Sequence, residues 1–256
     1  MPLPGQPDLS QTLDRGPFRN HLLATMPADD LQRLIPKLTW VTLSKRMRLA
    51  TQGSRLTFVY FVEDGIVPLI LGLGAIRMAV GMVGREGVVG TSVLYSVDHS
   101  TLYADVLIPG SAWRISADDL VAALAANPSL RRFLGQLLPI ELLQAQSTTL
   151  AAGQLSIEAR LSRWLLMMDD RLRGGSIQVV QRDVADVIGA TRPGITVGLR
   201  ELDDRRLIAL DRGVIHIRQR SGLIELAQGT YSLAEAEYAR LLGDFRDDRP
   251  AAISAR

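Results

Sequence analysis

The spacing of apolar residues changes character along the chain. Between about residues 40 and 116, short runs rich in Val, Ile and aromatic residues, such as "WVTLS", "RMAVGMV" and "SAWRIS", are separated by Gly, Pro, Asp and Ser. Short apolar runs with close turns predict an antiparallel β-roll or sandwich. From Ser116 onward the spacing becomes helical, and Ser116, followed by two acidic residues, is suited to cap the first of these helices. The predicted fold class is therefore α+β.

A distinct pattern between residues 181 and 202 predicts two short helices joined by a tight turn. Apolar residues at helical spacing mark one face of each helix: Val184, Val187, Ile188, Ile195, Leu199 and Leu202. Gly189 is a natural left-handed C-cap for the first helix, and Pro193 is tolerated in the first turn of the second. Either Thr191, accepting from the Gly194 N–H, or Arg192 could cap the second helix. This arrangement is a helix-turn-helix.

The segments on either side complete a predicted domain plan. "RLIALDRGVIHIRQ" predicts two strands around a turn at Arg212 and Gly213, which is the hairpin of a winged helix. In the long helical region, Pro139 is expected to kink the helix or to set its start near Ile140. The predicted domains are a β-roll at 18–125, a dimerisation helix at 126–155, a winged helix-turn-helix at 156–227 and a helical, then disordered, tail at 228–256. Residues 1–17 are also expected to be disordered.

Composition narrows the possible chemistry. The chain of 256 residues has no cysteine, which excludes disulfides and cysteine-ligated iron–sulfur clusters, and only three histidines, which lie far apart. The net charge is only +2, but 27 of the 29 basic residues are arginine, because lysine occurs only at 37 and 45. Arginine is the better ligand for phosphate and guanine, although GC-rich coding gives the same bias. No secretory signal or membrane span is indicated, so a cytoplasmic location is expected.

The order of these parts resembles the CRP/FNR family of bacterial transcription regulators. The resemblance covers about residues 18–227 and rests on three segments in this order: "GMVGREGVVGTSVL", "EARLSRWLLMMDDRL" and "VADVIGATRPGITVGLRELDDRRLIALDRGVIHI". It implies an N-terminal β-roll of the cupin-like jelly-roll type, a long dimerisation helix and a C-terminal winged helix-turn-helix. It also implies a homodimeric, sequence-specific regulator that binds a near-palindromic site in double-stranded DNA.

By this resemblance, the recognition helix begins near Arg192 and enters the major groove. Arginine forks suit guanine, and the methyl groups of Thr and Val suit thymine. Better-known members carry a Glu-Thr pair and a further Arg where this sequence has Pro193, Gly194 and Val197, so a different half-site is expected. The predicted DNA-binding residues are Thr191, Arg192, Gly194, Thr196, Val197, Arg200 and Arg212.

Two glycines and a group of arginines add to this interpretation. Gly194 has no side chain, so the backbone is expected to approach a sugar–phosphate strand closely. Gly198 replaces an apolar core position of the family, at a cost of about 1 kcal/mol in helix propensity. Further arginines in and around the wing are expected to contact phosphates: Arg205, Arg206, Arg212, Arg218 and Arg220.

The β-roll departs from the nucleotide-binding members of the family. In those relatives a Glu after a glycine-rich turn holds the ribose, and an Arg-Ser pair holds the cyclic phosphate. Here Thr91 takes the Glu position, and Ser100 and Thr101 take the Arg-Ser positions. Because a buried phosphate needs a fixed cation, cyclic AMP is not expected as the ligand. The candidate pocket for an unknown small-molecule effector consists of Gly87, Gly90, Thr91, Ser92, Ser100 and Thr101; a purely structural roll is the alternative.

The remaining polar residues of this region are expected to be structural. Arg85 and Glu86 predict a surface ion pair, and Gly84, Gly87 and Gly90 are expected to serve turn geometry. His99, beside Asp98, is typical of a loop rather than of a haem ligand.

Two other function classes remain as alternatives. A cupin-like metalloenzyme would need clustered histidines and carboxylates, but the β segment has one histidine, so neither enzyme activity nor a metal is expected. An interaction module that has lost specific DNA readout is supported by Pro193 and Val197. Activation would require contact with RNA polymerase, and no residue spacing identifies such a surface, so activator and repressor both remain open.

Overall fold

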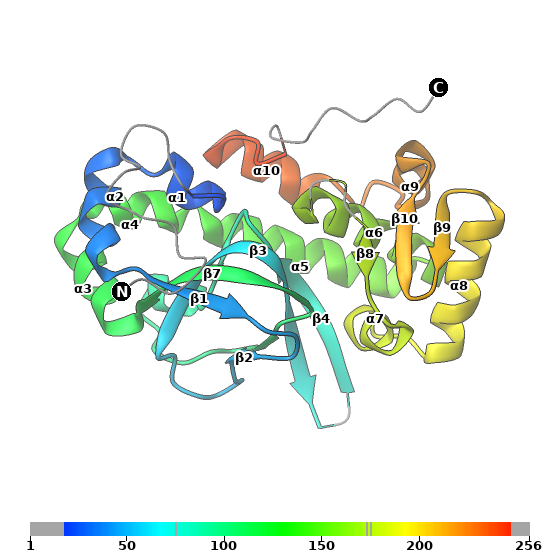
Figure 1. Cartoon of the computed structure of the whole chain (residues 1–256), viewed down its shortest axis with the longest axis horizontal. Helices are drawn as coiled ribbons and strands as arrows, with labels where there is room; N and C mark the ends of the chain where they lie inside the picture. The colour runs from blue at the N-terminus through cyan, green and yellow to red at the C-terminus, as the bar shows by residue number, and fades with distance from the viewer. Residues whose placement is uncertain (1–17, 75, 173, 175, 247–256) are drawn as a thin grey trace.

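The structure, a computed structural model, describes residues 18–246 except 75, 173 and 175. The predicted disorder of residues 1–17 therefore lies outside the described residues. A β-rich body and a smaller body of helices with a short sheet are connected by long helices (Figure 1). None of the described helices is both long enough and apolar enough to cross a membrane. The predicted α+β class is confirmed.

The N-terminal body is a seven-stranded antiparallel β-roll, as predicted. Its strands pair in the order β1-β7-β3-β6-β2, and β4 and β5 also pair with β3. Strand β3 is buried along most of its length because it pairs with four other strands. Phe61 and Trp113 are fully buried at the centre of the core. The strands are β1 Thr39–Leu43, β2 Arg48–Ala50, β3 Phe58–Leu73, β4 Ile76–Val83, β5 Val88–Val89, β6 Tyr103–Asp105 and β7 Ile108–Ser116.

Short helices gather at the end of the roll that lies away from the C-terminal body (Figure 1). The Ser116 hydroxyl accepts a hydrogen bond from the Asp119 N–H (3.1 Å), which confirms the predicted N-cap of α3. These helices are α1 His21–Thr25, α2 Ala28–Leu34, α3 Ala117–Ala126 and α4 Pro128–Gly135, with 3₁₀ helices η2 Ile35–Lys37 and η3 Thr91–Tyr95.

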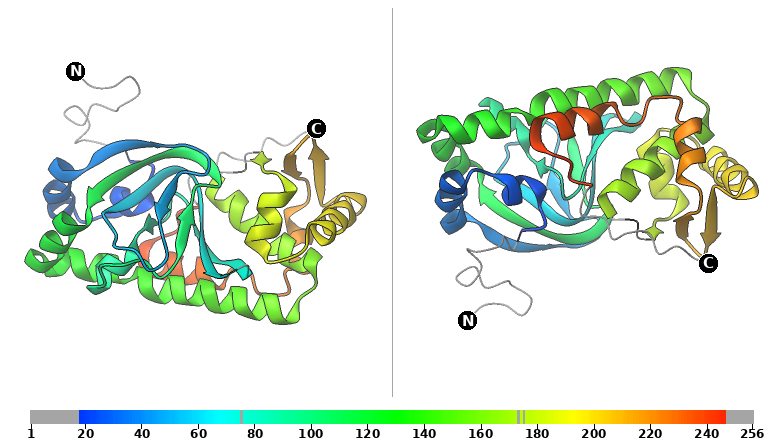
Figure 2. Two further views of the ribbon diagram at one scale, coloured as in Figure 1. Left: turned by 90° about the horizontal axis from the view of Figure 1, so that it is seen from below. Right: turned by 90° about the horizontal axis from the view of Figure 1, so that it is seen from above.

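Helix α5, Leu137–Gln154, runs along the roll (Figure 2). Pro139 lies in its first turn, so it marks the beginning of the helix, which starts slightly before the predicted Ile140. One face, including Ile140 and Gln144, is buried. Two leucines on another face, Leu138 and Leu142, are 48% and 54% exposed, which is unusual for large apolar residues and leaves this face available to a partner.

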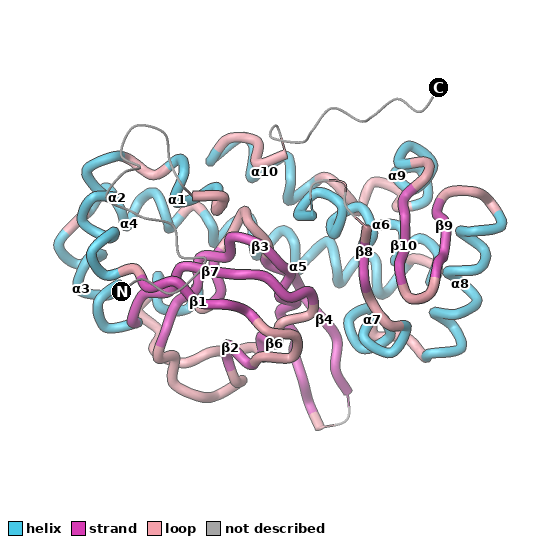
Figure 3. The backbone as a smooth tube through the Cα atoms, in the orientation of Figure 1, coloured by secondary structure: helices cyan, strands magenta, loops and turns pink. Residues whose placement is uncertain are grey.

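The C-terminal body is a winged helix-turn-helix. A three-stranded antiparallel sheet in the order β8-β10-β9 lies beside the helices, and its hairpin turns at Arg212 and Gly213 as predicted (Figure 3). The elements are α6 Ile157–Leu172, β8 Ile177–Gln178, α7 Gln181–Ile188, α8 Arg192–Asp204, β9 Ile208–Asp211, β10 Val214–Ile217 and α9 Arg220–Leu226.

The first helix of the helix-turn-helix packs against the β-roll of the same chain. Helix α7 contacts β4, and Asp183 of α7 forms ion pairs with Lys45 Nζ (3.2 Å) and Arg46 Nη2 (3.9 Å). By contrast, α8 packs against α6, α7 and β9, and lies at the far end of the molecule from the roll (Figure 1). The second helix therefore presents its outer face away from the roll.

The C-terminal tail is more ordered than the sequence predicts. Helix α10, Leu233–Leu242, folds back across α5, and Phe245 beyond it is only 2% exposed (Figure 2, right). The predicted helix is therefore present, but residues 243–246 are packed rather than disordered, because Phe245 contacts the Tyr238 ring. Residues 247–256 lie outside the described part of the chain.

Candidate DNA-binding interface and effector cavity

The turn between α7 and α8 is built by the local signals seen in the sequence. Gly189 adopts φ +66° at the C-cap of α7, a left-handed conformation that glycine adopts without strain. Thr191 caps α8, since its hydroxyl accepts from the Gly194 N–H (3.3 Å). Of the two predicted cap residues, Thr191 is therefore confirmed, while Arg192 is the first residue of the helix.

Helix α8 has one buried face and one exposed face. Ile195, Leu199 and Leu202 are buried against α6 and the wing, as their spacing predicts. On the other side, the side chains of Arg192 and Arg200 are exposed, and Val197 is 52% exposed. The Thr196 hydroxyl lies within hydrogen-bond distance of Gln181 Oε1 (2.8 Å) and Arg192 O (3.0 Å), so its methyl group remains for an apolar contact. The exposed face thus offers two guanidinium groups and two methyl-bearing side chains.

Gly194 and Gly198 are explained by packing. A Cβ at Gly194 would lie 2.8 Å from Ile157 Cδ1, and one at Gly198 would lie 2.8 Å from Leu161 Cδ1. Both glycines therefore let α8 lie close to α6. Packing thus adds to two expectations: Gly194 lets α8 approach α6 while its N–H is used by the cap, and Gly198 is a contact position rather than only a loss of helix propensity. The expected approach of Gly194 to a sugar–phosphate strand stays a prediction.

The arginines around the wing fall into two groups. Arg205, Arg206, Arg212 and Arg218 are exposed, and Arg212 lies in the tight turn with φ +38°. Arg220 differs, because Asp169 and Asp170 of α6 bind its guanidinium group. Arg220 is therefore engaged inside the domain, and its expected phosphate contact stays a prediction.

The Arg220 cluster ties α9 to α6. Its Nη2 lies 2.6 Å from Asp170 Oδ1, and the Tyr231 hydroxyl donates to Asp170 Oδ2 (2.6 Å). Asp170 is fully buried, so close partners within the protein must compensate its charge. Arg220 is thus a structural residue of the winged helix.

The predicted effector residues gather around one cavity in the roll, with one exception. The cavity has a volume of about 200 Å³, and Gly90, Thr91, Ser92, Ser100 and Thr101 all line it. Gly87 instead lines a neighbouring cavity of about 110 Å³ beneath α10. Gly90 has φ +100°, which accounts for the glycine at the start of η3.

Ser100, which aligns with the phosphate-binding arginine of the nucleotide-binding relatives, already makes a hydrogen bond within the protein. Ser100 Oγ donates to Leu102 O (2.6 Å) across a local turn, so it is not aimed at a ligand. His99 is exposed in a loop next to Asp98, as expected. The roll cavity is lined by no basic side chain among the described residues, so it has no fixed cation for a cyclic phosphate.

The expectation that Arg85 and Glu86 lie at the surface is wrong. The two residues are 3% and 6% exposed, and both bind partners far away in the sequence. Arg171 Nε of α6 donates to Glu86 Oε1 (2.8 Å), while Arg85 Nη2 donates to Phe245 O. Gly84 is needed for close packing as well as for the turn, because a Cβ there would lie 2.9 Å from Arg171. The tail supplies the cover that makes these charges buried.

The structure adds a residue that the sequence reasoning did not single out. Glu141 of α5 borders both cavities, and its carboxylate accepts a hydrogen bond from the Thr91 hydroxyl (3.0 Å). Burial raises the pKa of Glu141 to about 7, although the Thr91 hydrogen bond partly opposes this. An acidic residue beside Ile140, in a helix with no other charged side chain, was the available signal.

Glu141 should make stability depend on pH. In the unfolded chain the carboxyl ionises near its ordinary pKa of 4.5, but in the folded protein it keeps its proton until about pH 7. Stability should therefore fall as pH rises through that window. We expect Glu141→Gln, which retains an acceptor for Thr91, to be more stable than wild type by about 1–3 kcal/mol at pH 8. The difference should shrink toward pH 5.

Urea unfolding of both proteins from pH 5 to pH 8 measures this difference. Burial also raises the pKa of Glu63 to about 7, but that residue is present in both proteins and cancels in the comparison. A difference that is the same at every pH would show that Glu141 is ionised throughout.

Comparison with known proteins agrees with this architecture. Residues 159–226 match the family model of the Crp-like helix-turn-helix domain. The structure is similar to FixK2 from Bradyrhizobium japonicum, at 24% identity and a TM-score of 0.65, over 74% of this chain and 96% of that one. It is also similar to a putative crp/fnr-family transcriptional regulator from Eubacterium rectale, at 14% identity and a TM-score of 0.63, over 79% and 95% of the chains.

A third similar structure is the c-di-GMP-responsive global regulator CLP from Xanthomonas campestris. It is 17% identical with a TM-score of 0.60, and the match covers 75% of this chain and 99% of that one. A comparison with curated proteins gives no match.

These findings identify the fold and the C-terminal domain. The chain has the fold of the CRP/FNR transcription regulators, and its C-terminal domain is a Crp-like helix-turn-helix, which confirms the resemblance seen in the sequence. The family-model match of residues 159–226 supports a DNA-binding transcription regulator, and the structural likenesses show the fold.

Proposed function

We propose that the protein is a homodimeric, sequence-specific DNA-binding transcription regulator that works without cyclic AMP. The observation that carries this proposal is the outer face of α8, where Arg192, Val197 and Arg200 are exposed while the opposite face is fixed against α6. Arginine forks and methyl groups on a rigid helix are suited to base edges in the major groove. The exposed wing arginines, Arg212 among them, would bind the flanking phosphates.

The exposed face of α5 supports the homodimer. Apolar or small residues recur along it at alternating spacings of four and three, the pattern of a coiled-coil seam: Leu138, Leu142, Ala145, Thr149 and Ala152. A second copy of α5 would cover Leu138 and Leu142. The resulting two-fold axis would place two recognition helices about 34 Å apart, which matches successive major grooves.

Independence from cyclic AMP is supported by the composition of the roll cavity. Ser100 and Thr101 provide no positive charge there, and Glu141 places a carboxyl group at its border. A phosphate would meet an acidic group and no compensating cation, which disfavours its binding.

Fluorescence anisotropy on the protein's own upstream DNA and on a scrambled duplex tests the proposal. Across a salt series, we expect the upstream site to be bound about 10³-fold more tightly than the scrambled one, with no change on adding cyclic AMP. Equal, strongly salt-dependent binding to both duplexes would instead indicate an interaction module without specific readout. Rescue by cyclic AMP would overturn the effector part of the proposal.

A variant on the exposed face of α5 tests the dimer in the same assay. Leu142→Glu should give monomers in sedimentation and weaken operator binding about 100-fold or more, because the two half-sites would no longer be bound together. Ile224→Glu, at a 45% exposed residue of α9, is the matched control and should remain dimeric. A Leu142→Glu protein that stays dimeric would place the interface elsewhere.

A further inference from the structure

The roll cavity has one carboxyl group in its wall and no basic side chain among the described residues that line it. Its walls combine apolar side chains with hydroxyl groups and one carboxyl group: Ala50, Leu69, Val89, Leu102, Ala104 and Leu138, with Thr91, Ser92, Tyr95, Ser100, Thr101 and Glu141. A cavity of this kind disfavours anions, because a carboxylate without a neighbouring cation repels them in a poorly solvated site.

Two polar groups of this cavity are only partly satisfied within the protein. Thr91 donates the one hydrogen bond recorded for the Glu141 carboxylate among the described residues. The Tyr95 hydroxyl is buried and has no hydrogen-bond partner in the described part of the chain. Burial and the proximity of Glu141 both raise the pKa of Tyr95, so the two groups share one poorly solvated region. Buried polar groups are normally paired, so this arrangement points to a missing partner.

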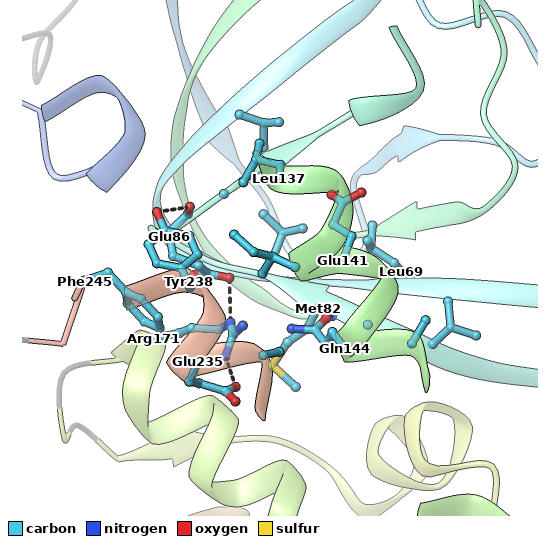
Figure 4. Close-up of a pocket in the computed structure, with 18 of the residues that line it drawn as sticks. Leu69, Met82, Glu86, Leu137, Glu141, Gln144, Arg171, Glu235, Tyr238 and Phe245 are labelled. Carbon is cyan, nitrogen blue, oxygen red and sulfur yellow. Dashed lines mark hydrogen bonds and ion pairs between the residues drawn. The ribbon is translucent and has the colours of Figure 1, made fainter. Parts of the chain in front are cut away.

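The buried cation that shares a cavity with Glu141 is not that partner. Arg171 lines only the smaller cavity, where Figure 4 shows it with Phe245 at one end and Glu141 with Leu69 at the other. Its guanidinium is bound by Glu86 (2.8 Å) and lies 3.9 Å from Glu235. The charge of Arg171 is therefore compensated without Glu141.

We propose that this cavity binds a small organic cation, an ammonium group on a short apolar body, with Glu141 as its counter-ion. The ammonium would donate to the Glu141 carboxylate and to the hydroxyl oxygen of Thr91 or Tyr95. That hydroxyl group can at the same time donate its own proton to the carboxylate. The apolar body would lie against Leu69, Leu102 and Leu138. Because Glu141 belongs to α5 and Thr91 to the roll, the ligand would link the sensor domain to the proposed dimer helix. A role of this ligand as an effector rests on the proposed function, but the binding of the ligand to the cavity does not.

Calorimetry with three probes of equal length tests the charge requirement. We expect n-butylammonium to bind the full-length protein at least tenfold more tightly than n-butanol, and butyrate to show no binding. This comparison uses wild-type protein, so it does not depend on the folding of any variant. Equal affinity for the cation and the alcohol, or tighter binding of butyrate, would overturn the proposal.

Variants locate the site. Glu141→Gln should remove the tenfold preference for n-butylammonium while leaving the affinity for n-butanol unchanged. Tyr95→Phe should lower the affinity for n-butylammonium about threefold. Glu225→Gln, at an exposed carboxylate of α9, is the control and should behave as wild type. Retained preference in Glu141→Gln would mean that the cation binds elsewhere.

The assay contains no DNA, so its outcome is separate from the proposed function. A protein that binds its operator but shows no preference for the cation would lose this inference alone.

Discussion

Replacing Arg220 by Ala is expected to lower the free energy of unfolding by about 3–5 kcal/mol, the usual effect of removing one partner from a buried ion pair. The substitution would leave Asp170, which is fully buried, with the Tyr231 hydroxyl but without its guanidinium partner. The contact between α9 and α6 would be weakened at the same time. Urea unfolding at pH 7, followed by circular dichroism, measures the change.

Arg218→Ala is the matched control, because Arg218 is two residues away, is exposed and carries the same charge. It should change stability by no more than about 0.5 kcal/mol. The double variant Arg220→Ala with Asp170→Asn should be more stable than Arg220→Ala alone, because the buried carboxylate that loses its guanidinium partner no longer carries a charge. If Arg220→Ala is as stable as Arg218→Ala but binds DNA more weakly, Arg220 is a phosphate contact after all.

This contrast shows which features the sequence could predict. The caps of α8 and α3, the turn at Gly189 and the wing turn at Arg212 depend on residues within a few positions of each other, so local rules identify them. The partners of Arg220 in α6 lie about 50 residues away along the chain. Local spacing contains no information about such a pair, and the same arginine therefore appeared to belong to the exposed wing.

The region beneath α10 was missed for the same reason. Arg85 and Glu86 are adjacent in sequence and oppositely charged, which normally indicates a solvated pair. They are buried only because Tyr238 and Phe245 return from the other end of the chain: the Tyr238 hydroxyl donates to Glu86 O (2.7 Å), and Phe245 O accepts from Arg85. Nothing in the spacing of the tail residues predicted where the tail would pack.

Gly194 and Gly198 show how a correct position can receive an incomplete explanation. The sequence places both on the recognition helix, where glycine is costly, and family resemblance directs attention to DNA. The structure shows that a Cβ at Gly194 would lie 2.8 Å from Ile157 of α6, and one at Gly198 would lie 2.8 Å from Leu161. Helix–helix distance is a tertiary property, so it was not available from the pattern of α8 alone.

A second large effect is expected on DNA affinity, because α8 is held in a fixed orientation. Arg192→Ala should reduce the affinity for the specific site by at least about 30-fold, because a guanine contact is worth about 1–3 kcal/mol and the proposed dimer would lose one at each half-site. Affinity for a scrambled duplex should change much less. Arg192 is exposed at the start of a helix that Thr191 caps, so its loss should not disturb folding or dimerisation.

Arg212→Ala provides the comparison that separates base readout from phosphate binding. Arg212 is exposed in the wing, so its replacement should weaken binding to specific and scrambled duplexes alike and should reduce the salt dependence by about one charge for each wing. Anisotropy titrations on both duplexes at several salt concentrations distinguish the two behaviours. If Arg192→Ala instead followed the Arg212→Ala pattern, Arg192 would be a phosphate ligand, and specific readout would have to come from Thr196, Val197 and Arg200.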